Sequence, residues 1–202
     1  MEKYKQKIFS IPFRGSRNYN WGPDFIKPIL DYQTKFYKNN LENIVVKINR
    51  FSTKDIRICS QEENPINFSG ESLIGTIKFQ NKNCIKRLLL LEENKKNNLE
   101  RIDFNESNYL NKHLVTESNN GILIKYSDHQ IALLVCANKY ILTKIFGLKI
   151  WTFASLKIKK YPFKNSPFQI KYNYNITNKL YISDISQDEI NIGQIIFGVK
   201  GG

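Results

Sequence analysis

The sequence is poor in the residues that build metal and disulfide sites. Its three cysteines, Cys59, Cys84 and Cys136, are odd in number and widely spaced, and none forms a CxxC or Cys/His pair. The spacing therefore indicates neither a zinc site nor a disulfide framework. The chain has only two histidines, His113 and His129, so any imidazole chemistry depends on one of them.

Long apolar runs and the common cofactor motifs are also missing. No apolar stretch approaches the roughly 20 residues of a membrane-spanning helix. The N-terminus lacks a long apolar region and a small-residue cleavage site, so we expect a soluble, cytoplasmic protein. The GxGxxG, P-loop, HExxH and GxSxG motifs do not occur. Dinucleotide, nucleotide and zinc-hydrolase functions thereby lose their main support.

Acidic residues are scarce beside basic ones, with 18 Asp and Glu against 31 Lys and Arg and a formal net charge of +13. This balance favours an anionic partner, such as nucleic acid, an acidic membrane surface or an acidic carrier protein. A chain crowded with Lys, Asn and Ile also fits the composition bias of an AT-rich genome. The basic residues are dispersed, with only short clusters such as Lys157, Lys159 and Lys160. Dispersal weakens the nucleic-acid interpretation, and both explanations of the charge stay open.

The sequence does contain a repeated order of expected elements. In the first half, residues 1–93, a short apolar strand precedes a helix that we expect Asp24 to cap. Four segments with period-two alternation, typical of half-buried strands, follow the helix. Residues 94–120 are polar and Asn-rich, which indicates a linker.

The second half, residues 121–202, repeats this order. A strand precedes a helix that we expect to begin at Asp128 and to end at Gly147. This helix is apolar nearly all round, so it must be buried on most sides. The two helix starts can be aligned, which matches Asp24 with Asp128. We therefore expect a duplicated architecture.

A long buried helix, preceded by a strand and wrapped by an antiparallel sheet, resembles the hot-dog fold. Two such units resemble double hot-dog proteins, among them β-hydroxyacyl carrier-protein dehydratases, acyl thioesterases and A-factor-biosynthesis-like proteins. Asp128-His129 is similar to the Asp-His helix opening of the A-factor type. The resemblance implies an α+β fold of two β-α-β-β-β units in one compact pseudo-dimer. It also implies an acyl thioester ligand, carried on coenzyme A or an acyl carrier protein.

The sequence departs from the catalytic pattern of the dehydratases. Those enzymes pair a histidine before the helix with an acid on the partner helix. Here the first half has no histidine, and the second helix has no Asp or Glu after Asp128. The pair we expect instead is His129 as general base, oriented by Asp24 or Asp31 from the first half. In the alternative interpretation His129 is an exposed first-turn residue and Asp24 only a cap.

The loop RGSRNYNWGP, before the first helix, carries the candidate binding residues Arg14, Arg17, Tyr19 and Trp21. Two arginines before a helix N-terminus can bind the phosphate of phosphopantetheine or coenzyme A. Equally, the aromatic rings can plug the helix entrance while the arginines stay solvated. Cys136, on the second helix, is a further substrate-binding candidate, although buried cysteines usually behave as small hydrophobes. No metal and no other cofactor is expected.

Three functional interpretations remain. The leading one is an acyl-thioester protein that catalyses dehydration, hydrolysis or acyl transfer. The second is a non-catalytic basic module for nucleic acid, with Tyr172 and Tyr174 as stacking platforms. The third is a hot-dog scaffold that has lost its chemistry. For His113, in the expected linker, both closure over a site and a plain surface position stay open. The oligomeric state, monomer or dimer of double hot-dogs, also stays open.

Overall fold

The structure of the protein is a computed structural model that describes residues 6–17, 22–60, 72–96 and 99–199. The chain forms two compact units, Met1–Phe104 and Asn105–Gly202, and each is described by itself. Among the described residues, no helix has both the length and the apolar character needed to span a membrane.

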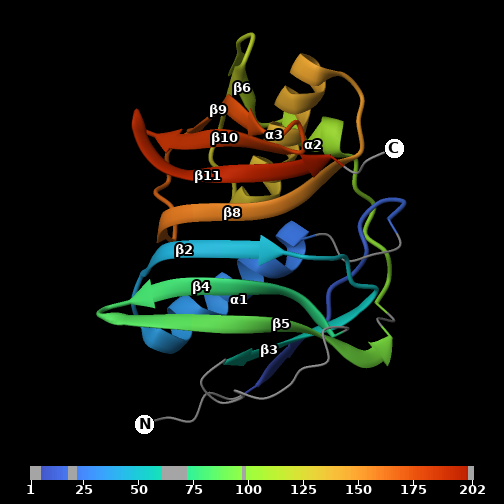
Figure 1. Cartoon of the computed structure of the whole chain (residues 1–202), viewed down its shortest axis with the longest axis vertical. Coiled ribbons are helices and arrows are strands. Elements are labelled where there is room, and N and C mark those ends of the chain that lie inside the picture. The colour runs from blue at the N-terminus through green and yellow to red at the C-terminus, as the bar shows by residue number, and fades with distance from the viewer. Residues whose placement is uncertain (1–5, 18–21, 61–71, 97–98, 200–202) are drawn as a thin grey trace. The chain divides into compact units, whose positions relative to one another are not determined.

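The first unit is an antiparallel sheet with one long helix (Figure 1). Its elements are β1 (Lys7–Phe9), α1 (Gly22–Tyr37), β2 (Leu41–Ile48), β3 (Lys54–Ser60), β4 (Leu73–Asn81) and β5 (Cys84–Lys96). The strands lie in the order β1-β3-β5-β4-β2, with every neighbouring pair antiparallel. The predicted strand, helix and four further strands are therefore present in this unit.

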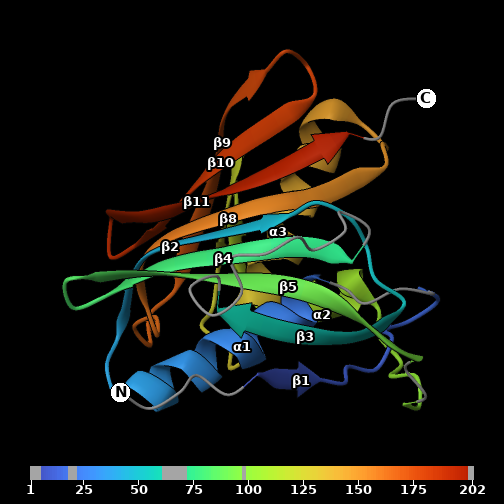
Figure 2. The ribbon, with the colours of Figure 1, turned by 60° about the horizontal axis from the view of Figure 1, so that its bottom comes forward.

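Helix α1 packs one apolar face and leaves the other to solvent. Phe25, Ile26, Ile29 and Leu30 are buried, and Figure 2 shows the helix lying along one face of the sheet of its unit. Burial of each such side chain stabilises the fold by about 1.5–3 kcal/mol. Pro28 lies within the second turn, where it cannot donate a backbone hydrogen bond. The helix continues through it because the buried face provides most of its stability.

The second unit has the same core order with two short elements before it. Its elements are α2 (Glu106–Asn111), β6 (Leu114–Glu117), β7 (Gly121–Ile124), α3 (Gln130–Phe146), β8 (Trp151–Tyr161), β9 (Phe168–Ile176), β10 (Leu180–Gln187) and β11 (Ile190–Val199). The strands lie in the order β8-β11-β10-β9-β7-β6, again antiparallel. Antiparallel sheets with few helices agree with the predicted α+β class.

Helix α3 is buried along most of its length, as its apolar sequence predicted. It ends at Phe146, where Gly147 adopts a φ of 79° and donates its N–H to the Thr143 carbonyl. Its predicted start was wrong. The helix begins at Gln130, and the N-cap residue is His129, whose side chain makes no capping hydrogen bond. Asp128 is instead an exposed turn residue.

The polar segment 94–120 contains secondary structure as well as loops. The end of β5, helix α2 and strand β6 all lie in it. The division between the two compact units falls inside this segment, after Phe104. The finer division into 1–93, 94–120 and 121–202 stays a prediction.

Candidate functional site

The first candidate site is an ion pair at the start of α1. Asp24 lies in the first turn of a helix that begins at Gly22, so its predicted role as N-cap is wrong. Its carboxylate instead accepts a hydrogen bond from Nε of Arg14, with 2.6 Å between the guanidinium nitrogen and Oδ1. The Asp24 side chain is only 5% exposed. The structure thus brings together two of the predicted site residues.

The environment of Asp24 makes its carboxyl a group that titrates close to neutral pH. Burial raises the pKa of Asp24 to about 6, because the loss of hydration outweighs the attraction of Arg14 and Arg17. Its second oxygen, Oδ2, is buried and has no hydrogen-bond partner among the described residues. A carboxyl held by one oxygen and titrating near pH 6 has the properties of a general acid or base.

The loop that carries Arg14 and Arg17 is fixed to a segment far away in the sequence. The Arg101 guanidinium donates to the carbonyls of Gly15, at 2.8 Å, and Arg17, at 2.7 Å. The Gly15 N–H donates to the Ile102 carbonyl at 2.9 Å. Gly15 has a φ of +57°, and a Cβ there would lie 2.8 Å from the Phe104 carbonyl oxygen. Only glycine fits this close approach.

Positive charge exceeds negative charge in this loop. The guanidinium of Arg14 also lies over the Phe104 ring, 5.0 Å from its centroid, and Arg17 donates to the Arg14 carbonyl. Arg14 and Arg17 thus act on the buried carboxylate of Asp24, Arg101 holds the loop, and Glu100 and Asp103 beside Arg101 are exposed. Such a cluster suits an anion. Tyr19 and Trp21, the predicted aromatic members, lie outside the described residues.

Sequence reasoning missed Arg101, and no local signal could have found it. Arg101 is 84 residues from Arg17 and lies in the segment predicted as a linker. The alternative carboxylate, Asp31, forms an ion pair at 2.6 Å with Lys27 on the exposed face of α1. The structure therefore favours Asp24 over Asp31 as a buried acid.

The second candidate site lies at the start of α3 in the second unit. His129 is exposed, as the simpler interpretation of this residue expected. The Tyr109 hydroxyl lies 3.2 Å from Oγ of Ser127 and 3.5 Å from the His129 carbonyl. The same tyrosine ring contacts His113, with 5.1 Å between the centroids. Tyr109 of α2 therefore contacts the His113 ring and the backbone of His129.

The environment of His113 favours the neutral form of its imidazole. Burial lowers its pKa, and the positive charges of Lys125 and Lys112 lower it further. The uncharged imidazole of His113 is therefore favoured over the protonated form. The proposed pairing of His129 with Asp24 stays a prediction, since the two residues lie in different units.

Helix α3 also buries two side-chain amides. Gln130 donates from Nε2 to the Tyr126 hydroxyl at 2.6 Å, and its Oε1 is buried without a partner among the described residues. Asn138 is 0% exposed, and neither amide atom has such a partner. Both were missed, although a polar residue in an apolar helical run is a readable signal. Cys136 is 3% exposed on the same helix, as expected of a small hydrophobe.

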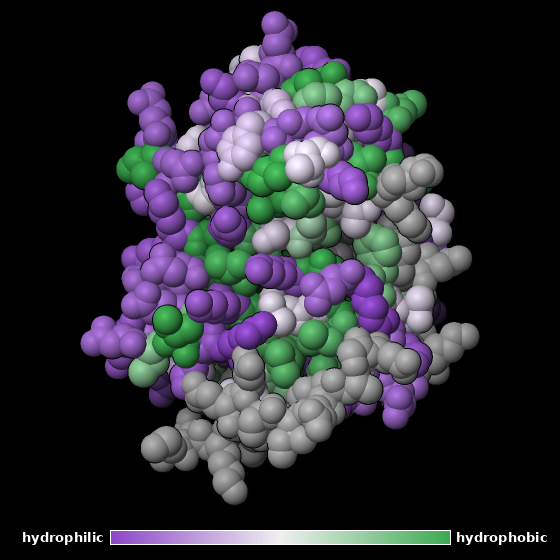
Figure 3. Space-filling view, viewed as in Figure 1, coloured by the Kyte–Doolittle hydropathy of each residue, from purple (hydrophilic) through white to green (hydrophobic). Residues whose placement is uncertain are grey.

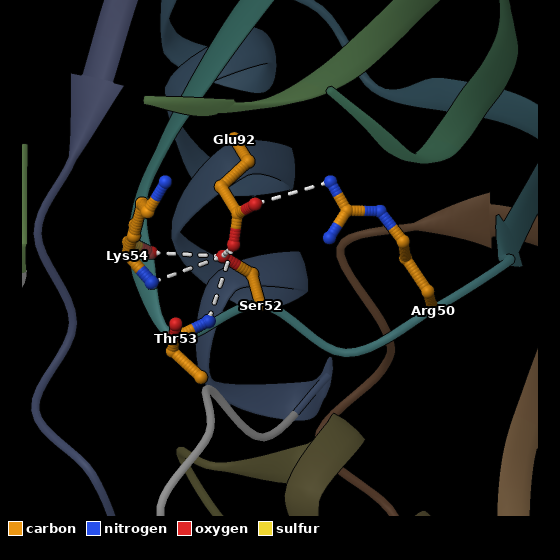
Figure 4. A network of polar contacts seen from close by, with 5 residues as sticks. All are labelled: Arg50, Ser52, Thr53, Lys54 and Glu92. Carbon is orange, nitrogen blue, oxygen red and sulfur yellow. Dashed lines mark hydrogen bonds and ion pairs between the residues drawn. The ribbon is translucent and has the colours of Figure 1, made fainter. Parts of the chain in front are cut away.

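A further polar network has a structural role (Figure 4). Oε1 of Glu92, on β5, accepts from Ser52 at 2.8 Å and from the Thr53 backbone N–H at 3.3 Å. Its other oxygen accepts from Arg50 at 3.1 Å. These hydrogen bonds fasten the β2–β3 connection to β5 and lower the pKa of Glu92 despite the opposing effect of burial. The described residues contain no group of three or more His, Cys, Asp or Glu side chains suited to a metal.

The residues predicted as stacking platforms on β9 differ in accessibility. The Tyr172 ring packs against Phe146, with 5.1 Å between centroids, whereas Tyr174 is 45% exposed. Only Tyr174 therefore offers an open ring, which gives little support to a nucleic-acid surface on this strand.

No family model matches the chain, and no curated protein matches it in sequence. Its fold, however, is similar to that of solved structures. The tesB protein of Mycobacterium avium subs paratuberculosis superposes with a TM-score of 0.57 at 5% identity, over 97% of this chain and 93% of the other. A protein of Novosphingobium aromaticivorans that carries a thioesterase assignment gives 0.52 at 8% identity, over 97% and 96%. Likeness at such low identity establishes fold alone, and the predicted hot-dog fold is confirmed.

Proposed function

We propose that this chain is a tandem hot-dog protein that hydrolyses an acyl thioester carried on coenzyme A or an acyl carrier protein. The observation that carries the proposal is the buried Asp24–Arg14 pair at the start of the α1 helix. Each unit has a strand, a long helix and an antiparallel sheet in the same order, which supports the tandem arrangement. The thioesterase assignment of the Novosphingobium aromaticivorans protein with this fold supports thioester chemistry.

The proposed binding step uses the arginine loop. Arg14 and Arg17 hold a phosphate of the coenzyme A or phosphopantetheine group, because guanidinium and phosphate form strong charge-assisted hydrogen bonds. Arg101 positions this loop through its two carbonyl contacts and is not itself required to touch the ligand. A basic protein also suits an acidic carrier protein as its partner.

The proposed chemical step uses the carboxylate of Asp24. Above a pKa of about 6 it is ionised and accepts a proton from a water molecule. The water oxygen attacks the thioester carbonyl carbon, the carbon–sulfur bond breaks, and the proton passes to the leaving thiolate. The products are a carboxylic acid and a thiol, and no oxidant or reductant is needed. His129 stays the predicted histidine partner of this carboxylate.

The test combines binding and turnover on the full chain. Native mass spectrometry with a panel of acyl-coenzyme A and acyl carrier protein species measures binding, and release of free thiol measures hydrolysis. We expect Arg14→Ala and Arg17→Ala to weaken binding, and Asp24→Asn or His129→Ala to abolish turnover. Arg87→Ala is the matched control, because Arg87 is an exposed arginine of β5.

The outcomes separate the three interpretations. Binding of acyl species without turnover in the unaltered protein indicates a scaffold that has lost catalysis. Absence of binding to every acyl species, together with salt-sensitive retention of RNA or DNA, contradicts the proposal and favours a basic nucleic-acid module.

A further inference from the structure

A pocket of about 190 Å³ lies in the second unit where β8 and β10 end and β11 begins. Part of its lining is cationic and part is apolar. The cationic residues are Lys159, Lys160 and Lys164, and the apolar ones include Phe163, Ile190 and Ile192. None of these side chains contributes to the sites described above.

The walls of the pocket are held in place by hydrogen bonds. Gln187 is buried, and its Nε2 donates to the carbonyls of Lys164, at 3.1 Å, and Ser166, at 2.8 Å. The hairpin between β10 and β11 turns through Asp188 and Glu189, with φ values of 50° and 63°. Two consecutive residues with positive φ form the tight turn that matches strand twist. The shape of the pocket is therefore built into the fold.

Positive charge at the pocket is incompletely neutralised. Among the described residues, the Lys159 side chain donates to the backbone carbonyl of Asn191, at 2.6 Å. Lys164 lies 3.5 Å from Asp188, and both side chains are well exposed, so this ion pair contributes little. Lys160 has no hydrogen bond or ion pair with any described residue. Three lysines thus line the pocket, and Asp188, in the adjoining turn, pairs with one of them.

Apolar surface beside these cations is left open to solvent. Ile190 is 59% exposed, although it begins a strand. Figure 3 shows a green, apolar cluster beside hydrophilic side chains near the tip of the β10–β11 hairpin. The aliphatic stems of the lysines extend this apolar surface while their charged ends stay in water. A ligand that covers Ile190 gains the hydrophobic contribution of that burial.

We propose that this pocket binds an aliphatic carboxylate, with the chain against Phe163, Ile190 and Ile192 and the carboxylate at Lys160 and Lys164. The volume corresponds to about six water molecules at roughly 30 Å³ each, so we expect a short chain. An inorganic anion would leave the apolar lining uncovered, and a neutral alcohol would leave the ammonium groups unpaired. The inference is independent of thioester hydrolysis.

Isothermal titration calorimetry on the full chain tests the inference, with hexanoate, hexan-1-ol and inorganic phosphate as the probes. We expect one saturable hexanoate site per chain, with the other two probes binding at least roughly tenfold more weakly. Lys160→Ala and Lys164→Ala should each weaken hexanoate binding roughly three- to tenfold, and added salt should weaken it further. Lys179→Ala, an exposed lysine in the β9–β10 turn, should leave it unchanged.

Several results would overturn the inference. Phosphate binding as tight as hexanoate binding would indicate a plain anion patch. Full hexanoate affinity in a folded Lys160→Ala/Lys164→Ala double variant would place the ligand elsewhere. Loss of hexanoate binding in Arg14→Ala would place the hexanoate site in the first unit. These binding measurements contain no thioester, so their outcome does not depend on whether the protein hydrolyses thioesters.

Discussion

The long helices of the two units have the same place in the element order but bury different kinds of polar side chains. Helix α1 carries charged side chains, with Asp24 paired to Arg14 and Asp31 paired to Lys27. Helix α3 is buried from Gln130 to Asn138, and its buried polar residues, Gln130 and Asn138, are neutral amides. The comparison separates a buried group that can exchange a proton from buried groups that can only form hydrogen bonds.

This difference indicates which helix start is suited to catalysis. A buried carboxyl with a pKa of about 6 changes its charge near neutral pH, whereas an amide does not titrate. Near the start of α3, Tyr109 contacts the His113 ring and the His129 backbone carbonyl, and neither contact holds a buried carboxyl. The buried acid Asp24 lies in the first unit, whereas His113 and His129 lie in the second.

Removal of the proton-exchanging group should have the largest effect. Asp24→Asn keeps the shape of the side chain and a hydrogen-bond acceptor for Arg14 but cannot accept a proton from water. We expect thioester hydrolysis to fall roughly 100-fold or more, the usual contribution of a general base, with substrate binding retained. Thiol release measures the rate, and Asp31→Asn, on the exposed face of α1, is the control. Equal activity in both variants would remove Asp24 from the mechanism.

The stability of the protein should respond to pH through Asp24. Because its folded-state pKa, about 6, is raised above its ordinary value of 3.8, the folded state binds the proton more tightly than the unfolded state. The contribution of Asp24 is therefore greatest below pH 4 and is lost as pH rises to about 6, by roughly 2–3 kcal/mol. Urea unfolding of the wild type and of Asp24→Asn, across pH 4 to 7, measures the difference.

Glu92 provides an internal contrast to Asp24. Its pKa is lowered by hydrogen bonds from Ser52 and Arg50, so its contribution is present above the ordinary value and is lost as pH falls. Glu92→Gln should therefore reduce the loss of stability in acid, while Asp24→Asn should reduce the loss toward neutral pH. Profiles that shift in the same direction for both variants would contradict the opposite environments assigned to the two acids.

The buried amide of α3 allows a smaller test of the comparison. Asn138 is fully buried with both amide atoms unpaired among the described residues, which costs free energy. Asn138→Leu should raise the free energy of unfolding by about 1–3 kcal/mol. The reverse change at a neighbouring position, Leu134→Asn, should lower it by a similar amount or more. A destabilised Asn138→Leu would mean that the amide is paired in solution, for example by a buried water.

The sequence was sufficient for the two long helices and most strands because their periodicity reflects burial. Ile44 and Val46, for example, alternate with more accessible neighbours on β2, and the apolar run of α3 matches its burial. Helix starts were less predictable. Asp24 and Asp128 both have the residue type of an N-cap, but Asp24 is drawn into an ion pair with Arg14 and Asp128 lies in the preceding turn. Local propensity could not reveal either outcome.

Long-range contacts explain the rest of what was missed. The arginine loop was recognisable as a candidate from Arg14 and Arg17, yet its fastening depends on Arg101, 84 residues beyond Arg17. The pocket at Lys160 and Ile190 depends in the same way on two strands that neighbour in the sheet order only through folding. Periodicity reports which residues are buried, whereas sites depend on which buried or exposed residues meet.

The smallest predicted effect concerns His113, in the second unit. Its pKa is lowered by burial first and by Lys125 and Lys112 next, so removing a lysine should raise it without restoring its ordinary value. Lys125→Gln should move the midpoint of the His113 imidazole titration upward by a fraction of a pH unit. NMR of the imidazole resonances measures this midpoint, and Lys171→Gln is the matched control. An unchanged midpoint in Lys125→Gln would contradict the prediction that the charge of Lys125 lowers the pKa of His113.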